Sequence, residues 1–252
     1  MKIYENAPQY YSQGYSDSNQ ATNGEQMVMR ELLHNGDIVI DAGANSGMWT
    51  EYALSQADVY IHAFEPVPSA FEILQSRVNS EKTVLNRCAL GSQSGVRTMY
   101  IAGPRHLGQQ DTNGVLDHKL LVSQVSSLFP MNLSFHDVTS TPYDVQVITL
   151  DEYCLSKRID KISFLKIDTE GAEYDVIQGA KKLTQHRVIH FMQFEYGPSY
   201  KATGISLRVV FDHLKTYSIY RILSDSLLHI PVWNDSLENY VFSNYLASEG
   251  VI

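Results

Sequence analysis

The sequence predicts an α/β fold with a mainly parallel sheet and helices on both of its faces. Short apolar runs alternate along the chain with segments whose apolar residues recur at helical spacing. The first strand-like run leads into a glycine-rich turn at residues 41–47, and a helix-compatible segment follows that turn. Strands that alternate with helices form β-α-β units, which build parallel sheets covered on both sides.

Composition bounds the class of protein. The chain has 252 residues, of which 44% are hydrophobic and 19% charged, so it can bury a core without disulfides or metals. Its net charge of −9 and the lack of a Lys/Arg cluster disfavour a nucleic-acid partner. No apolar run approaches the ~18 residues of a membrane span, and the N-terminus has no secretory signal. We expect a soluble, cytoplasmic protein with reduced cysteines and no membrane partner.

The chain is predicted to hold one domain, at 25–252, after a polar, tyrosine-rich arm at 1–24. Largely apolar runs of five to nine residues predict strands. Apolar residues at helical spacing predict helices, and a proline before such a segment or a glycine after it marks where the helix begins or ends. The expected strands cover 38–42, 59–64, 83–90, 162–168, 188–195, 218–223 and 239–247, and the expected helices cover 27–33, 47–56, 69–79, 170–183 and 205–217.

An insertion interrupts this alternation at about residues 96–148. It is rich in Gly, Pro, Ser and Asn and carries three histidines, His106, His118 and His136. A structureless loop of that length is unusual within a compact domain unless it has a function. We expect a strand at each end, over 96–102 and 145–150, and a substrate-covering segment between them. A surface loop without that role is the alternative.

The glycine-rich turn DAGANSG, from Asp41 to Gly47, is the strongest chemical signal. It lies between a predicted strand and a predicted helix, where open α/β sheets bind ligands. Asn45 stands where a dinucleotide fingerprint has its second glycine, which disfavours a nicotinamide cofactor. Glu65 ends the second predicted strand, 24 residues after Asp41. A carboxylate there can accept hydrogen bonds from both hydroxyls of a ribose.

Several segments in order resemble the S-adenosylmethionine-dependent methyltransferases of the FkbM type. They are DAGANSG, FEP, NRCALGSQSG, SSL, FLKIDTEGAE and ENYVFSNYLA, and together they extend over roughly residues 25–247. The resemblance implies a Rossmann-like methyltransferase fold, with a seven-stranded, mainly parallel sheet whose last strand is antiparallel. It also implies methyl transfer, commonly to a hydroxyl on a sugar, polysaccharide or polyketide-type acceptor.

The resemblance also implies site residues. Asp41 would lie near the methionine ammonium group, Glu65 would bind the ribose, and Asp168 would lie beside the methyl group and the acceptor. The residues expected to bind S-adenosylmethionine are Asp41, Gly43, Ala44, Asn45, Gly47, Glu65, Pro66, Arg87, Cys88, Ala89, Ser126 and Asp168.

Methylation of a hydroxyl requires alignment with the sulfonium methyl group and benefits from a general base. The candidate catalytic residues are Asp168, Glu195 and His136. Asp168 and Glu195 end two predicted strands, and with Glu170 they would supply oxygen ligands for Mg²⁺ if the enzyme needs a metal. The expected acceptor is a small molecule or glycan, and the sequence is compatible with a homo-oligomer. A nicotinamide-dependent oxidoreductase and a non-catalytic S-adenosylmethionine-binding protein are the alternatives.

Overall fold

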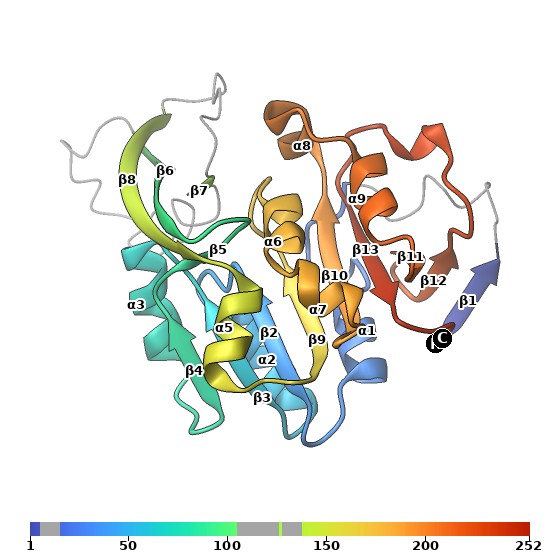
Figure 1. Ribbon diagram of the computed structural model, residues 1–252, viewed down its shortest axis with the longest axis horizontal. Helices are drawn as coiled ribbons and strands as arrows, with labels where there is room; N and C mark the ends of the chain where they lie inside the picture. Colours follow the sequence, from blue (N-terminus) through green and yellow to red (C-terminus); the bar gives the residue numbers. More distant parts are fainter. Residues whose placement is uncertain (6–15, 105–125, 128–137) are drawn as a thin grey trace, which may run out of the picture.

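The computed structural model describes residues 1–5, 16–104, 126–127 and 138–252. Its centre is a nine-stranded sheet in the order β1-β12-β11-β13-β10-β9-β2-β3-β4 (Figure 1). In chain order these strands are β1 (Lys2–Glu5), β2 (Ile38–Ala42), β3 (Tyr60–Phe64), β4 (Thr83–Asn86), β9 (Ile162–Ile167), β10 (Ile189–Tyr196), β11 (Ser218–Ile222), β12 (Ser226–His229) and β13 (Ser243–Ser248).

The pairing of the strands confirms the predicted α/β sheet. Strands β4, β3, β2, β9 and β10 are mutually parallel, whereas β13, the last strand, is antiparallel to both β10 and β11. The seven expected strands form one continuous part of the sheet. Two further strands extend the sheet beyond β11, because β12 pairs with β11 and β1 pairs with β12. The arm therefore begins with an edge strand at Lys2–Glu5, which is not among the expected strands.

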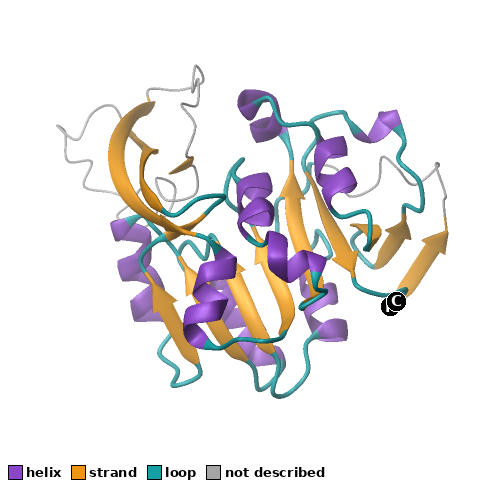
Figure 2. Cartoon of the chain, viewed as in Figure 1, coloured by secondary structure: helices purple, strands orange, loops and turns teal. Residues whose placement is uncertain are grey.

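Helices cover both faces of the sheet, as expected (Figure 2). Helices α1 (Glu25–Leu32), α2 (Met48–Gln56) and α3 (Pro68–Arg77) contribute to one apolar cluster, and α5 (Leu150–Lys157), α6 (Glu173–Gly179), α7 (Lys181–Gln185) and α9 (Leu207–His213) contribute to the other. No helix in the described ranges is long and apolar enough to cross a membrane.

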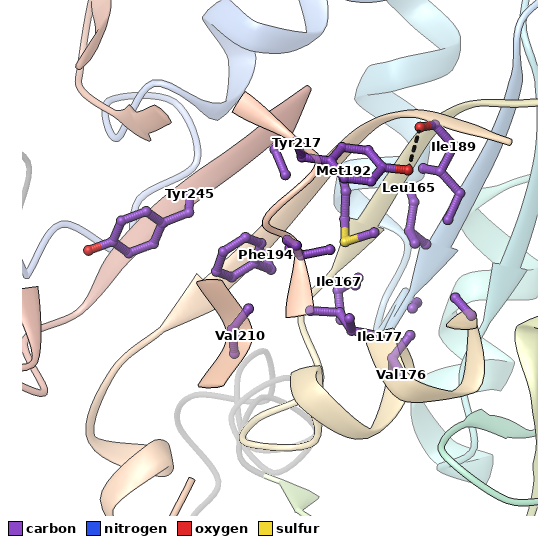
Figure 3. Packing of buried hydrophobic residues seen from close by; sticks show 14 of the residues in the cluster. Leu165, Ile167, Val176, Ile177, Ile189, Met192, Phe194, Val210, Tyr217 and Tyr245 are labelled. Carbon is purple, nitrogen blue, oxygen red and sulfur yellow. Dashed lines mark hydrogen bonds between the residues drawn. The ribbon is translucent and has the colours of Figure 1, made fainter. Parts of the chain in front are cut away.

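Strand β9 shows how the core is divided between the two faces. All six of its residues are buried, because parallel strands in the centre of such a sheet are covered on both sides. Successive side chains alternate, so Phe164 lies in one apolar cluster and Leu165 in the other. Figure 3 shows the second cluster, where the Tyr217 hydroxyl donates a hydrogen bond to the Ile189 carbonyl at 3.0 Å. The central strands are thereby held rigidly, and their ends are fixed in space.

The insertion contributes to a second, four-stranded sheet in the order β5-β8-β6-β7. Its strands are β5 (Ala89–Leu90), β6 (Gly95–Pro104), β7 (Ser126–Ser127) and β8 (Val138–Ile148). Strands β6 and β8 pair in antiparallel fashion, which confirms a strand at each end of the insertion. The segment predicted between them to cover the substrate lies mostly outside the described residues.

The predicted strand 83–90 is divided between the two sheets. Its first part, β4, ends at Asn86, whose side-chain amide donates to the carbonyls of Ala63 and Val84. These hydrogen bonds lie at the end of β4. The chain then leaves the first sheet and joins the second sheet as β5, which pairs with β8. Ala89 consequently packs with Val67 and Met99 between the second sheet and the start of α3.

Some helix boundaries differ from the prediction. The segment 170–183 forms two helices, α6 and α7, that meet at Ala180, and a Cβ on Gly179 would come within 2.1 Å of the Gly91 carbonyl oxygen. Helix α5 is missed: the sequence analysis assigns Leu150 to the end of a strand and predicts no helix after it. Its start does have a sequence signal, since Thr149 accepts a hydrogen bond from the Glu152 amide as an N-cap. Helix α8 (Pro198–Thr203) is also missed.

Candidate functional site

A pocket of about 610 Å³ lies at the carboxyl ends of the central parallel strands. Open α/β sheets bind ligands at this edge. The turn after β2, the ends of β3, β9 and β10, the second sheet and the segment before α1 all contribute to its walls. The lining residues used below are Gln20, Glu25, Gly43, Ala44, Asn45, Glu65, Pro66, Ala89, Leu90, Met99, Lys166, Asp168, Glu170, Glu195 and Phe242.

The glycine-rich turn after β2 forms one wall of the pocket. Gly43 has a φ of +80°, and a Cβ there would lie 1.8 Å from the Asp168 carbonyl oxygen, so only glycine lets this turn lie against the end of β9. Asn45 also has a positive φ, 50°, which asparagine tolerates better than most residues. Asn45, which stands where a dinucleotide-binding fingerprint has its second glycine, thus still adopts a left-handed backbone conformation.

Glu65 lies at the end of β3 and lines the pocket, where the sequence predicts a ribose-binding acid. Its two carboxylate oxygens accept hydrogen bonds from the backbone amides of Asn45, at 2.9 Å, and Val67, at 2.8 Å. Burial raises the pKa of Glu65 to about 7, although both amide hydrogen bonds act to lower it. The carboxylate is therefore fixed in position and retains lone pairs for a ligand.

Lys166 is a buried cation at the centre of the site that sequence reasoning misses. Its ammonium Nζ lies 3.0 Å from the Gly43 carbonyl oxygen, 3.2 Å from Asp41 Oδ1 and 3.4 Å from Asp168 Oδ2. Burial acts to lower the pKa of Lys166, but the attraction of Asp41, Asp168 and Glu25 outweighs it and holds the pKa above its usual value. A single charged residue within the apolar strand ISFLKI was the available signal.

Asp41 is placed differently from the expectation based on the resemblance. Its side chain is fully buried and does not line the pocket. The Thr50 hydroxyl donates to Asp41 Oδ2 at 2.5 Å, and Lys166 lies beside the other oxygen. Asp41 therefore acts on the turn indirectly. It pairs with Lys166, whose ammonium group donates to the Gly43 carbonyl of the turn, and its own side chain does not face the pocket.

One end of the pocket is strongly acidic. Asp168, Glu170 and Glu195 line it together, as the order of the strands predicts, and Glu25 joins them from the start of α1. Burial, and then repulsion from Asp168 and Glu173, raise the pKa of Glu170 to about 8. Burial also raises the pKa of Glu195 well above its ordinary value, with Asp168 and Glu170 adding to the effect.

The structure does not support the Mg²⁺ site expected at Asp168, Glu170 and Glu195. Within the part of the chain that is described, no group of three or more His, Cys, Asp or Glu side chains is arranged to hold a metal ion. One physical reason is that the Asp168 carboxylate is already paired with Lys166.

The remaining predicted residues divide into three groups. Ala44, Pro66 and Ala89 line the pocket, as expected for cofactor contacts. Three other residues do not line the pocket, namely Gly47, Arg87 and Cys88. Gly47 precedes α2, and Arg87 is exposed. Cys88 is half-buried, and burial raises the pKa of its thiol to about 11. Cys88 and Cys154 are both free thiols. Ser126 is described only as part of β7, and His136 lies outside the described residues.

The fold and the pocket define a class of protein. An open, mainly parallel sheet with a glycine-rich first β-α turn, and a carboxylate at the end of the neighbouring strand, is typical of Rossmann-like domains that bind nucleotide cofactors. Residues 41–221 match the family model described as "Methyltransferase FkbM domain". The chain belongs to this methyltransferase family, which confirms the resemblance seen in its motifs.

Two curated proteins are similar over part of the chain. It is 28% identical over 166 residues to the "31-O-demethyl-FK506 methyltransferase FkbM" of Streptomyces tacrolimicus, covering 62% of this chain and 64% of that protein. It is 27% identical over 147 residues to "Methyltransferase 1" of Beauveria bassiana (strain ARSEF 2860), covering 56% and 57%. The matched region therefore spans less than two thirds of either relative.

Solved structures resemble the chain only at a low level. An rRNA methylase from Streptococcus thermophilus has a TM-score of 0.46 and 12% identity, covering 92% of this chain and 98% of that one. A TehB-like SAM-dependent methyltransferase from Corynebacterium glutamicum has a TM-score of 0.42 and 9% identity, covering 90% and 88%. Likenesses at this level carry no argument about the acceptor.

Proposed function

We propose that this protein transfers the methyl group of S-adenosylmethionine to a hydroxyl of a natural product or sugar. Membership of the FkbM methyltransferase family supports the reaction class. The name of the Streptomyces relative describes a 31-O-demethyl compound, which favours a hydroxyl acceptor. The cofactor would lie with its adenine by Ala89, Leu90 and Met99, its ribose at Glu65, and its sulfonium group toward Asp168.

The observation that carries this proposal is the position of Glu195. Its carboxylate lines the acidic end of the pocket together with Asp168 and Glu170. Its raised pKa makes it a stronger base than an ordinary glutamate, which suits removal of a hydroxyl proton. In the reaction, the acceptor oxygen would form a bond to the methyl carbon as the carbon–sulfur bond breaks. The hydroxyl proton would pass to Glu195, and S-adenosylhomocysteine would leave.

Asp168 would have a different part in the same step. Its ion pair with Lys166 fixes its orientation, so it is better suited to orient the acceptor than to accept a proton. His136, the third candidate base from the sequence, lies outside the described residues and stays a prediction. The expectation of no nucleic-acid acceptor likewise stays a prediction.

An acceptor panel tests the proposal directly. The protein would be incubated with S-adenosylmethionine and separately with hydroxylated macrolides, sugars, primary amines and structured RNA, and S-adenosylhomocysteine would be measured by mass spectrometry. We expect product only with hydroxylated small molecules, and methyl ether in that product by NMR. Turnover with RNA or amines alone would refute O-methylation, and binding without turnover of any acceptor would favour the non-catalytic alternative.

A further inference from the structure

Residues 18–26, which lead into α1 and include its first two residues, form a pocket wall that lies outside the matched family domain. Gln20 and Glu25 both line the pocket, whereas the family match begins only at residue 41. The segment is fixed at both ends. The Ser16 amide donates to the Phe242 carbonyl at 2.9 Å, and a Cβ on Gly24 would lie 2.0 Å from the Leu223 carbonyl oxygen. Its contact with the sheet is therefore close enough to require glycine.

Glu25 is held in the pocket by neutral amide groups. Its Oε1 accepts hydrogen bonds from the side chains of Asn23, at 2.6 Å, and Asn244, at 3.3 Å, and its Oε2 accepts one from Gln193 at 2.9 Å. All three donors are buried. Amides orient a carboxylate but bring no positive charge, and Lys166, the cation close by, already contacts Asp41 and Asp168. A ligand cation beside Glu25 would therefore find a fixed, incompletely neutralised partner.

Gln20 provides a second, independent observation on the same wall. Its side-chain nitrogen Nε2 is buried and donates to no acceptor among the described residues. A buried amide donor without a partner costs free energy that a ligand acceptor would recover. Glu25 and Gln20 thus offer an anion and a donor on one short segment, the complement of an ammonium and a carboxylate.

We propose that Gln20 and Glu25 bind the α-amino-acid end of the cofactor, with Glu25 receiving the ammonium group and Gln20 donating to the carboxylate. Asp41, expected to contact the ammonium, is buried beneath the turn and leaves this position open. The sheet order β3-β2-β9-β10 places Glu65 and the Glu25 partner Gln193 on opposite sides of the cofactor turn. A cofactor whose ribose lies at Glu65 would thus extend its amino-acid end toward Glu25. The inference rests on the cofactor placement proposed above.

Two ligands separate this binding site from the rest of the pocket. S-adenosylhomocysteine carries the amino-acid end, whereas 5′-methylthioadenosine has the same nucleoside without it. By calorimetry, we expect Glu25→Gln to weaken S-adenosylhomocysteine binding by about tenfold or more, the range for a hydrogen bond to a charged group. Binding of 5′-methylthioadenosine should stay within about twofold. Gln20→Leu should show the same selectivity with a smaller loss. Glu31→Gln, on the exposed side of the same helix, is the matched control.

Each other result has a definite meaning. Equal losses for both ligands would show that Glu25 only shapes the pocket, and unchanged affinity for both would place the ammonium elsewhere; either result overturns the inference. Glu65→Gln should weaken both ligands, which verifies the nucleoside end separately. If the wild-type protein bound neither ligand, the cofactor placement itself would fail, and that outcome is distinct from a failure at Glu25 alone.

Discussion

The two ends of the pocket are built in different ways. One end is largely apolar, with Ala89, Leu90 and Met99 beside the single carboxylate of Glu65. The other end gathers four carboxylates, Glu25, Asp168, Glu170 and Glu195, around the ammonium group of Lys166. The apolar end suits a flat, neutral ring, whereas the acidic end suits cations and proton transfer. In the proposed function, the nucleoside of the cofactor would lie at the apolar end, and the proton transfer would take place at the acidic end.

The largest effect is expected at Lys166, which connects the turn of one end to the carboxylates of the other. Lys166→Met would leave the fully buried Asp41 without its cationic partner, and breaking a buried ion pair in this way costs about 3–5 kcal/mol. Chemical denaturation should show this loss of unfolding free energy. Lys161→Met, at an exposed position just before the same strand, should cost less than about 1 kcal/mol. Equal costs would mean that the ion pairs contribute little.

A second prediction separates catalysis from binding at the acidic end. Glu195→Gln removes the proposed base but keeps its shape, so turnover should fall by about 10²-fold or more. The affinity for S-adenosylhomocysteine should stay within about twofold in calorimetry, because the base acts on the acceptor. Steady-state kinetics would show the loss in kcat. A turnover within threefold of wild type would exclude Glu195 as the base and leave Asp168 or His136.

A third prediction concerns the apolar end. Glu65→Gln retains one oxygen acceptor but removes the charge, so S-adenosylhomocysteine should bind more weakly by about 1.5–3 kcal/mol. Because burial raises the pKa of Glu65 to about 7, the wild-type affinity should increase as pH rises from 6 to about 8, while the variant should lose the part of this dependence that comes from Glu65. Calorimetry at several pH values measures both effects. A variant with wild-type affinity would remove the ribose assignment.

The smallest effect is expected in the pH dependence of stability without ligand. The pKa values of Glu65, Glu170 and Glu173 are raised in the folded state, to about 7, 8 and 7, from an ordinary value of 4.5. Protonated forms are therefore favoured on folding, and this contribution is present below pH 4.5 and lost as pH rises through 7 to 8. The melting temperature should fall by several degrees, ~5 °C, between pH 5 and 9.

A variant and a counter-result make this last prediction specific. Glu170→Gln, which does not titrate, should reduce the dependence of the melting temperature on pH. A melting temperature that rises over the same range would mean that these carboxyl groups are ionised at low pH, and the electrostatic account of the acidic end would be wrong.

The sequence predicts the apolar end better than the acidic end, for a physical reason. The turn at Gly43 and the carboxylate at Glu65 belong to consecutive β-α units, so strand order alone brings them together. Glu25 is held in the site partly by hydrogen bonds from Gln193 and Asn244, which are far away in the sequence. Such contacts depend on tertiary packing, which periodicity does not encode.

The positions of buried charged side chains are the second feature that sequence patterns predict poorly. The sequence predicts Asp41 at the end of its strand. Whether its side chain faces the pocket or the core depends on the alternation of side chains along β2 and on the ion pair with Lys166. The seven strands from β11 to β4 in the sheet order are predicted from runs that alternate with helical segments. Strands β1 and β12, which extend the sheet beyond β11, are missed because each has only four residues and two of these are polar.

The contact of Lys166 with Gly43, Asp41 and Asp168 also bears on how the proposed methyltransferase could change its acceptor. A mutation at Asp168 would disturb the glycine-rich turn as well as the proposed acceptor position, since Lys166 contacts both the turn and Asp168. Phe242 lines the same pocket and, as an uncharged side chain, takes no part in these ion pairs. New acceptor ranges, whether selected in nature or engineered in the laboratory, should therefore arise by substitution at Phe242 while Glu195, Asp168 and Lys166 stay constant.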